Sequence, residues 1–536
     1  MSITSFSFLL FLAVLLAVYY LTPKKWQWVV LLCASAAFYL LSGVEGFVFV
    51  LLTAATSYGA VRWMQALADR QKAYFAANRG ELTREEKSAF KAATKKKRRT
   101  ILIVTLVLNF GVLCFFKYFH FLFAQVNGLL GLLGLPQGED TLRFLVPLGI
   151  SFYTFQTMGY VVDVYWGNCR AEGNFLKTLL FVSFFPQITQ GPISDFEQLS
   201  AELFTGHSFC YENYSLGGQR MLWGFFKKIV IADLLAPYVG DIFQNYAAYS
   251  GATVMVGGLM YSVQIYADFS GYMDIMCGLC QMLGIRLREN FDRPYFSKSI
   301  AEYWRRWHIS LGDWFKKYIY YPIAMAKWNL RIGQKARTHF GKTLPASIAL
   351  VAVWLTTGLW HGASWAYIAW GGVNGLFIIL SLWLEPVYQR CKHALHIREA
   401  SFWWRAFQTV RTFLLVTFIK VLPEVGTLRD GLGFWKRAFT AFTLPSSLQE
   451  LLPMQNNPTS VLSGFCSDLT GNLLIIAFGV CLMFAASLIQ RKTPCRQAMQ
   501  KWPRLLRWAF FVALAVLTVW VKAYSGLSGG FMYAQF

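Results

Sequence analysis

Long apolar runs, separated by short polar or basic segments, make up most of the chain. The first run, residues 5–21, has no basic segment before it and no A-x-A cleavage site after it, which predicts a retained helix rather than a signal peptide. A helix crosses a bilayer with about 20 apolar residues. Runs near that length follow at 26–42, 46–62, 101–123, 144–166, 219–238, 252–284, 344–360, 364–384, 406–422, 472–490 and 505–523. The pattern predicts an all-α polytopic membrane protein with about ten to twelve transmembrane helices.

Two apolar segments depart from simple crossings. The run 252–284 is too long for one crossing, and Gly271 offers a point at which it could bend. The run 176–192 contains Pro186 and Pro192, which predicts a re-entrant or broken segment packed inside protein. We expect a single membrane-embedded domain over residues 1–536, with its helices around a central cavity.

Basic residues between the apolar runs predict the orientation of the chain. Residues 62–99 contain twelve Lys or Arg and four acidic residues. The positive-inside rule places this segment in the cytoplasm as a basic loop. Counting back three spans then places the N-terminus outside the cytoplasm, and the expected location is the cell (inner) membrane.

The composition excludes several classes of soluble protein. The 536 residues carry a formal charge of +23, yet only 14% are charged, against about 25% in soluble proteins. A nucleic-acid partner is therefore disfavoured, and lipid is the expected surroundings. The segment 286–337 also has twelve basic and four acidic residues, so the two blocks hold +16 of the +23. The ten cysteines are scattered and indicate neither a disulfide framework nor a metal site.

The second basic block contains two signals for short helices. Ser299 with Glu302 fits a capping box, and Ser310 with Asp313 repeats the pattern. Each segment mixes aromatic residues with Arg or Lys and is too short to span. Both are predicted to be amphipathic helices in the headgroup region.

Four motifs within residues 144–384 occur in an order that resembles a known family. They read D-F-S-G-Y-M-D at 268–274, E-N-F-D-R-P-Y at 289–295, Y-W-R-R-W-H-I-S-L at 303–311 and L-W-H-G-A-S-W at 359–365. Together they are similar to the core signature of membrane-bound O-acyltransferases, in particular the bacterial alginate O-acetylase-like subgroup. Residues 147–156, 184–187, 191–192, 227–233 and 531–536 resemble that subgroup too.

The chain departs from the family pattern in two places. Asn374 stands where the family often has a second histidine. Residues 418–436 contain no recognisable Phe-Phe-Arg-Ala stretch. The second departure leaves open the acceptor and any partner that docks there.

His361 is the leading catalytic candidate. Between Trp354 and Trp370 no residue is charged, and His361 alone titrates near neutral pH. An ionisable group within a membrane segment is a functional hypothesis, and a neutral imidazole could remove a proton from an acceptor hydroxyl. The alternative is a structural histidine, but the resemblance favours catalysis. The resemblance also makes His308 a second site residue, although a helix cap or a phosphate contact explains it equally well.

The resemblance implies a cytoplasmic thioester donor, acetyl-CoA or an acyl-carrier thioester, rather than a resident cofactor. Arg305, Arg306, Lys316 and Lys317 are predicted to bind its phosphates, since the chain has no glycine-rich phosphate loop. Separately, three carboxylates within or beside apolar runs are expected to pair structurally with Lys227, Lys228 or an arginine; they are Asp233, Asp268 and Asp274.

The predicted function is transfer of an acyl group, most simply acetyl, to a hydroxyl of an exported polysaccharide. The transfer would be direct or would pass through a serine on an extracytoplasmic relay protein. Transfer of D-alanine to teichoic acid is the alternative within the same class. A transporter is the alternative from another class, but the halves of the chain share no duplicated motif.

Overall fold

The computed structural model describes residues 2–142, 146–335, 338–454, 457–491, 493, 495–527 and 530–532. In this part of the chain the regular structure is helical, and the β-type pairing is one isolated bridge between Phe291 and Trp307. The all-α prediction is therefore confirmed. Three predicted features lie partly outside the described residues: the start of the span 144–166, the end of the basic block 286–337, and residues 533–536 of the C-terminal motif.

The chain divides into two compact units, one of residues 1–214 and 280–287 and one of residues 215–279 and 288–536. The first contains α1 (Phe6–Leu21), α2 (Gln27–Leu40), α3 (Val44–Ala77), α4 (Arg84–Leu132), α5 (Ile150–Trp166), α6 (Phe175–Ser183), α7 (Phe185–Ile188) and α8 (Phe196–Leu203). The second contains most of α9 (Tyr211–Phe226) and α11 (Gly251–Met282), and all of α10 (Leu234–Gln244) and α12 (Ile300–Arg306) to α24 (Arg504–Ser525).

The helices between those two are α13 (Ile309–Phe315), α14 (Tyr321–Ala324), α15 (Lys327–Lys335), α16 (His339–His361), α17 (Trp365–Trp383), α18 (Glu385–Ala394), α19 (Phe402–Val421), α20 (Leu428–Thr440), α21 (Leu448–Leu451), α22 (Asp468–Ile489) and α23 (Cys495–Met499).

Six helices in the described part of the chain are long and apolar enough to cross a membrane: α3, α4, α16, α17, α22 and α24. The protein is thus a multi-pass membrane protein. Six is fewer than the ten to twelve predicted spans. Several apolar runs form shorter helices, such as α1 with 16 residues and α2 with 14. At 1.5 Å per residue, 16 residues extend only about 24 Å.

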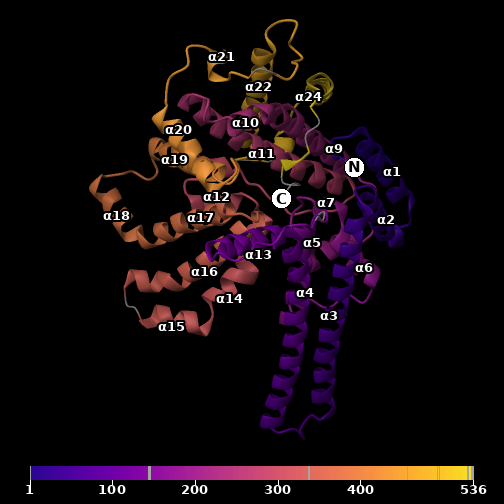
Figure 1. Cartoon of the computed structure of the whole chain (residues 1–536). Helices are drawn as coiled ribbons and strands as arrows, with labels where there is room; N and C mark the ends of the chain where they lie inside the picture. The colour runs from indigo at the N-terminus through magenta and orange to yellow at the C-terminus, as the bar shows by residue number, and fades with distance from the viewer. Residues whose placement is uncertain are drawn as a thin grey trace. The chain divides into compact units, whose positions relative to one another are not determined.

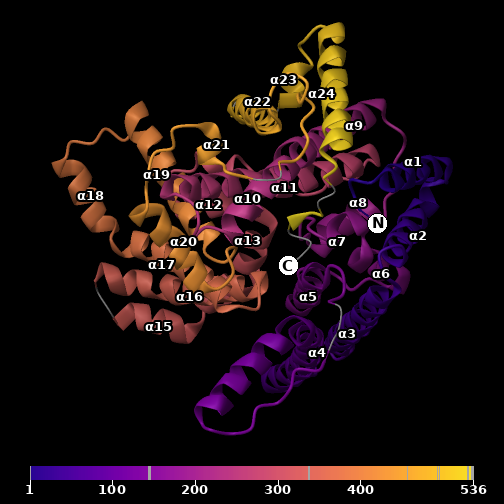
Figure 2. The same ribbon diagram turned by 45° about the horizontal axis from the view of Figure 1, so that its top comes forward.

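The basic segment 62–99 is a helical hairpin, not the predicted loop. α3 continues to Ala77 and α4 begins at Arg84, so the two long helices lie side by side with a short turn between them (Figures 1 and 2). Thr83 and Glu86 form a capping box at the start of α4. The rings of Tyr74 and Phe90 stack with centroids 4.6 Å apart. Aromatic contacts and capping allow the helices to continue through a charged segment.

Of the two irregular apolar runs, 176–192 has the predicted structure and 252–284 does not. Residues 176–192 are broken as predicted, since α6 ends at Ser183, the four-residue α7 carries Pro186, and the whole segment after it is buried. In contrast, α11 is one helix through Gly271. A Cβ at Gly271 would lie 3.0 Å from the carbonyl oxygen of Gly224 in α9, so the glycine permits close backbone packing of two helices.

The helices of the second basic block differ from the prediction in two respects. Ser299 caps α12 by accepting from the Glu302 N–H, as expected. However, α13 begins two residues earlier than predicted, and His308 rather than Ser310 occupies its N-cap position with φ +51°. The aromatic side of α12 is also buried in protein instead of anchoring at a headgroup surface, since Tyr303 and Trp307 are each 1% exposed.

Buried charges join α9 and the π-helical turn Lys227–Asp233 to α11. Lys228 Nζ lies 2.8 Å from Asp233 and 2.7 Å from Asp268. Asp274 accepts from Lys227 at 2.7 Å and from Arg220 at 2.8 Å. The predicted structural pairing of these carboxylates is therefore confirmed. Such pairs hold neighbouring helices in register, because removing one partner leaves a buried charge uncompensated.

Small residues bring α16 and α17 close together in the second unit. The Cβ of a residue at Gly358 would lie 2.5 Å from the Tyr367 carbonyl oxygen, and a Cβ at Gly371 would overlap the Trp354 carbonyl oxygen. Both views show the two helices side by side (Figures 1 and 2). This packing places His361, the last residue of α16, against the first turns of α17.

We predict that Gly371→Ala destabilises the protein, whereas Gly372→Ala does not. The added methyl group at 371 collides with the backbone of α16, while the space around residue 372 is open to 4 Å. Overpacking of this kind costs about 1–3 kcal/mol. Thermal unfolding of the detergent-solubilised variants measures the difference. Because both changes replace a helical glycine by alanine, equal melting temperatures would contradict the packing argument.

Candidate active site

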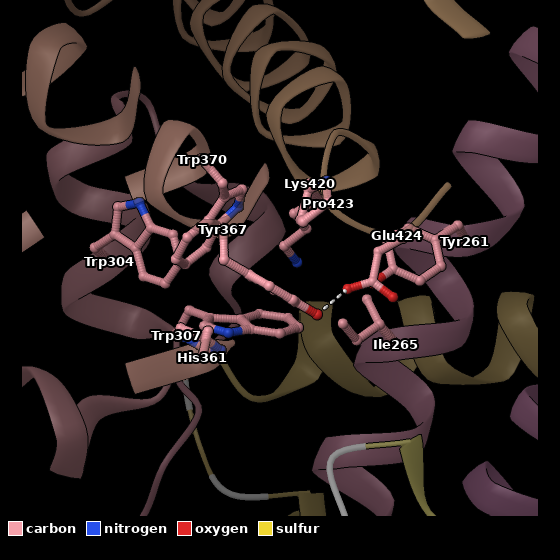
Figure 3. Close-up of a pocket in the computed structure, with 10 residues that line it drawn as sticks. All are labelled: Tyr261, Ile265, Trp304, Trp307, His361, Tyr367, Trp370, Lys420, Pro423 and Glu424. Atoms are coloured by element: carbon pink, nitrogen blue, oxygen red, sulfur yellow. Dashed lines mark hydrogen bonds between the residues drawn. The ribbon is translucent and has the colours of Figure 1, made fainter. Parts of the chain in front are cut away.

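A cavity in the second unit brings together residues from five segments of the chain. Its lining consists of Tyr261, Ile265, Trp304, Trp307, His361, Tyr367, Trp370, Lys420, Pro423 and Glu424 (Figure 3). These residues come from α11, the α12 region, the end of α16, α17 and the end of α19 with the turn after it. Aromatic rings form most of the wall, and the ionisable groups are an imidazole, an ammonium and a carboxylate.

His361 is buried in the wall of this cavity, with 6% of its surface exposed. The Trp370 ring meets the imidazole edge-on at 4.8 Å, and the Tyr367 ring lies parallel to it at 6.3 Å with an interplanar angle of 11°. A Cβ at Gly362 would overlap the Tyr367 ring, so the glycine next to His361 makes this stacking possible. The C-terminus of α16 favours positive charge, which suits an imidazole that accepts a proton during a reaction.

Lys420 and Glu424 were not singled out from the sequence, although both line the cavity. The ammonium of Lys420 lies 3.4 Å from the centroid of the Trp307 ring and 3.3 Å from the Tyr295 hydroxyl. Glu424 accepts a hydrogen bond of 3.1 Å from the Tyr367 hydroxyl. A lysine and a glutamate four residues apart at the end of an apolar run were the available signal.

His308 is near His361 without lining the cavity. The ring of Trp360 lies between the two imidazoles, 5.9 Å from His308 and 5.0 Å from His361. His308 lies outside the candidate membrane helices and is 2% exposed. Burial lowers the pKa of its imidazole to about 3. A neutral, buried ring does not suit the phosphate contact that was one interpretation of this residue.

The four cations predicted to bind donor phosphates are not gathered in the cavity. Arg305 and Lys316 are exposed. Arg306 pairs with Glu302 at 2.7 Å, and the Lys317 ammonium lies 5.0 Å from the Tyr318 ring centroid. None of the four is among the residues that line the cavity. Their role toward a donor stays a prediction.

Asn374, which stands at the position of an expected second histidine, has a structural role beside the cavity. Its side-chain oxygen accepts a 3.0 Å hydrogen bond from the Trp304 indole, and its amide donates 2.9 Å to the Trp370 carbonyl oxygen. The residue is 1% exposed. Asn374 therefore fixes the orientation of one aromatic wall and links α12 to α17.

The chain is similar to a known protein family and to several known proteins. The model of the MBOAT, membrane-bound O-acyltransferase family, matches residues 172–419, which include the motifs at 268–311, His361 and most of α19. A probable alginate O-acetylase of Pseudomonas aeruginosa is 32% identical over 431 residues, which cover 80% of this chain and 73% of that protein. The chain belongs to the membrane-bound O-acyltransferase family. It is accordingly an O-acyltransferase, and the transporter alternative is set aside.

Relatives with other substrates in their names are also similar. A peptidoglycan O-acetyltransferase of Helicobacter pylori is 33% identical over 305 residues, covering 52% of this chain and 54% of that protein. A teichoic acid D-alanyltransferase of Streptococcus thermophilus is 25% identical over 315 residues, covering 56% of this chain and 73% of that protein. The chemistry that these names share is transfer of an acyl group.

We predict that Asn374→Leu destabilises the protein by about 1–3 kcal/mol, because the indole N–H of Trp304 then lacks its acceptor in a half-buried site. The loss should be much smaller in a Trp304→Phe background, which has no indole N–H. A double-mutant cycle of unfolding free energies separates this bond from general packing effects. Equal losses in both backgrounds would show that Asn374 acts through something other than Trp304.

Proposed function

We propose that this O-acyltransferase moves an acetyl group from a cytoplasmic thioester to a hydroxyl of an exported polysaccharide, directly or through an extracytoplasmic relay protein. The observation that carries the proposal is the position of His361 in a mostly aromatic cavity. Similarity to acetyltransferases that are named for alginate and peptidoglycan supports the acetyl group and the polymeric acceptor.

In the proposed reaction His361 is the general base. Its neutral imidazole accepts the proton of the acceptor hydroxyl while that oxygen attacks the thioester carbonyl carbon. The tetrahedral intermediate then collapses, the carbon–sulfur bond breaks, and the imidazolium returns the proton to the leaving thiolate. The helix C-terminus at His361 stabilises the transient positive charge. Tyr367 and Trp370 keep the imidazole in one orientation through the reaction.

The proposed orientation follows from the charge of the α3–α4 hairpin. Its basic residues would lie on the cytoplasmic side of the inner membrane, with the N-terminus on the opposite side. The donor would then approach from the cytoplasm, where acetyl-CoA and acyl-carrier thioesters are made, and Arg305, Arg306, Lys316 and Lys317 would provide positive charge for its phosphates. Accessibility of single cysteines to an impermeant reagent in intact cells would test each side.

D-alanine is the second candidate for the transferred group, since one relative is named for that transfer. The two candidates share the thioester chemistry and differ in the donor. Supplying labelled acetyl-CoA and a labelled D-alanyl thioester in parallel distinguishes them. Mass spectrometry of the exported glycans then identifies the acceptor.

We predict that His361→Ala reduces acyl transfer by about 10²–10⁴-fold in proteoliposomes with a labelled thioester, because the general base is lost. His393→Ala is the matched control, since His393 lies in α18 with an exposed side chain. Both variants are compared at equal amounts of folded protein. Full activity of His361→Ala would remove His361 from the mechanism.

A further inference from the structure

The cavity contains a buried cation that the general-base mechanism does not use. Lys420 lies in the last turn of α19, with 6% of its surface exposed, and shares the cavity with His361. Burial of an ammonium is expensive unless other groups compensate its charge. We therefore asked what a buried lysine does in the same cavity as the candidate general base.

The surroundings of Lys420 offset part of the cost of burying its ammonium. The face of Trp307 lies 3.4 Å away, and the rings of Tyr303 and Tyr295 lie at 5.1 and 5.2 Å. Aromatic faces attract cations, and more strongly where water is excluded. Glu424 contributes a negative charge near the ammonium. Its carboxylate is held in turn by the Tyr367 hydroxyl at 3.1 Å.

One N–H group of the Lys420 ammonium is also available to donate a hydrogen bond into the cavity. An ammonium carries three N–H groups. One is directed to the Tyr295 hydroxyl at 3.3 Å, and the Trp307 face occupies a second direction. Figure 3 shows the nitrogen of Lys420 directed into the space between Tyr367 and Trp307. His361 lines the same cavity, so both groups border the space in which an acyl group would bind.

We propose that Lys420 is a catalytic residue that stabilises the oxyanion of acyl transfer, an inference that rests on the proposed function. As the acceptor oxygen bonds to the thioester carbonyl carbon, the carbonyl π electrons move onto oxygen, and the Lys420 N–H donates to that oxyanion. The electrons return when the carbon–sulfur bond breaks, and the proton on His361 goes to the leaving thiolate. Lys420 keeps its own protons throughout. Donors fixed in advance at a developing negative charge are among the largest contributions to catalysis.

Two other roles for Lys420 make different predictions. A lysine that only supports packing would change stability but not the rate of the folded enzyme. A lysine that anchors a negatively charged part of the substrate before reaction would change KM rather than kcat. An oxyanion donor acts only in the transition state, so its loss lowers kcat and leaves KM in place.

The test compares Lys420→Met with Lys392→Met in proteoliposomes. Lys392 is a matched control, because it is also buried, lies 2.6 Å from Glu399, and has its ammonium 4.8 Å from the Tyr388 ring, but it is in α18 and does not line the cavity. We expect Lys420→Met to lower kcat by about 10²–10³-fold with KM for donor and acceptor unchanged. Lys392→Met should keep the wild-type kcat, and Lys420→Arg should recover part of the loss.

Unchanged kcat per folded molecule in Lys420→Met, or a raised KM with normal kcat, would overturn the assignment. If Lys420→Met does not fold, Glu424→Gln provides the second measurement. This variant keeps an acceptor for the Tyr367 hydroxyl but removes the negative charge near the Lys420 ammonium. We expect kcat to fall at least about tenfold. An unchanged kcat would likewise overturn the assignment. If the wild-type protein is inactive with both the acetyl and the D-alanyl thioester, the proposed function itself is refuted. If the wild type is active and Lys420→Met is equally active, only the inference about Lys420 is refuted.

Discussion

Burying a charge in a medium of low dielectric costs free energy, and this cost explains how the buried lysines of the second unit are surrounded. Each buried cation described there has a defined set of partners: Lys227 and Lys228 have carboxylates, and Lys420 has aromatic faces with Glu424 nearby. Burying an ion without such partners reduces the free energy of unfolding by several kcal/mol. The pairs around Lys227 and Lys228 consequently tie the π-helical turn after α9 to α11. The group around Lys420 is different, because it borders a cavity.

Close helix packing gives the cavity its shape. Glycines at 358 and 371 let α16 and α17 approach, and Gly362 leaves room for Tyr367 to stack beside His361. Asn374 then holds the Trp304 ring from α17. The imidazole is confined by rings on several sides, so its orientation does not depend on a substrate. A preorganised base of this kind needs little rearrangement when the reaction begins.

The proposed base and the proposed oxyanion donor come from different helices and have different supports. His361 is oriented by rings and by the end of α16, whereas Lys420 is oriented by Trp307, Tyr295 and the charge of Glu424. Tyr367 connects the two, because its ring stacks on His361 and its hydroxyl donates to Glu424. A change at Tyr367 would therefore affect both groups. Family membership accounts for acyl transfer, while the Lys420–Glu424 group lies in the stretch where the chain departs from the family pattern.

The sequence by itself determined the helical membrane class, the broken segment 176–192 and the pairing of the buried carboxylates, and it singled out His361 as the catalytic candidate. Each depends on local composition or on the cost of an unpaired charge, which can be read from neighbouring residues. Only the tertiary structure decided that the basic segment 62–99 is a helical hairpin, because its ring contacts join residues of α3 to residues of α4. It also decided that Lys420 and Glu424, some 60 positions after His361, share its cavity. Periodicity along one helix carries no information about which distant helix will face it.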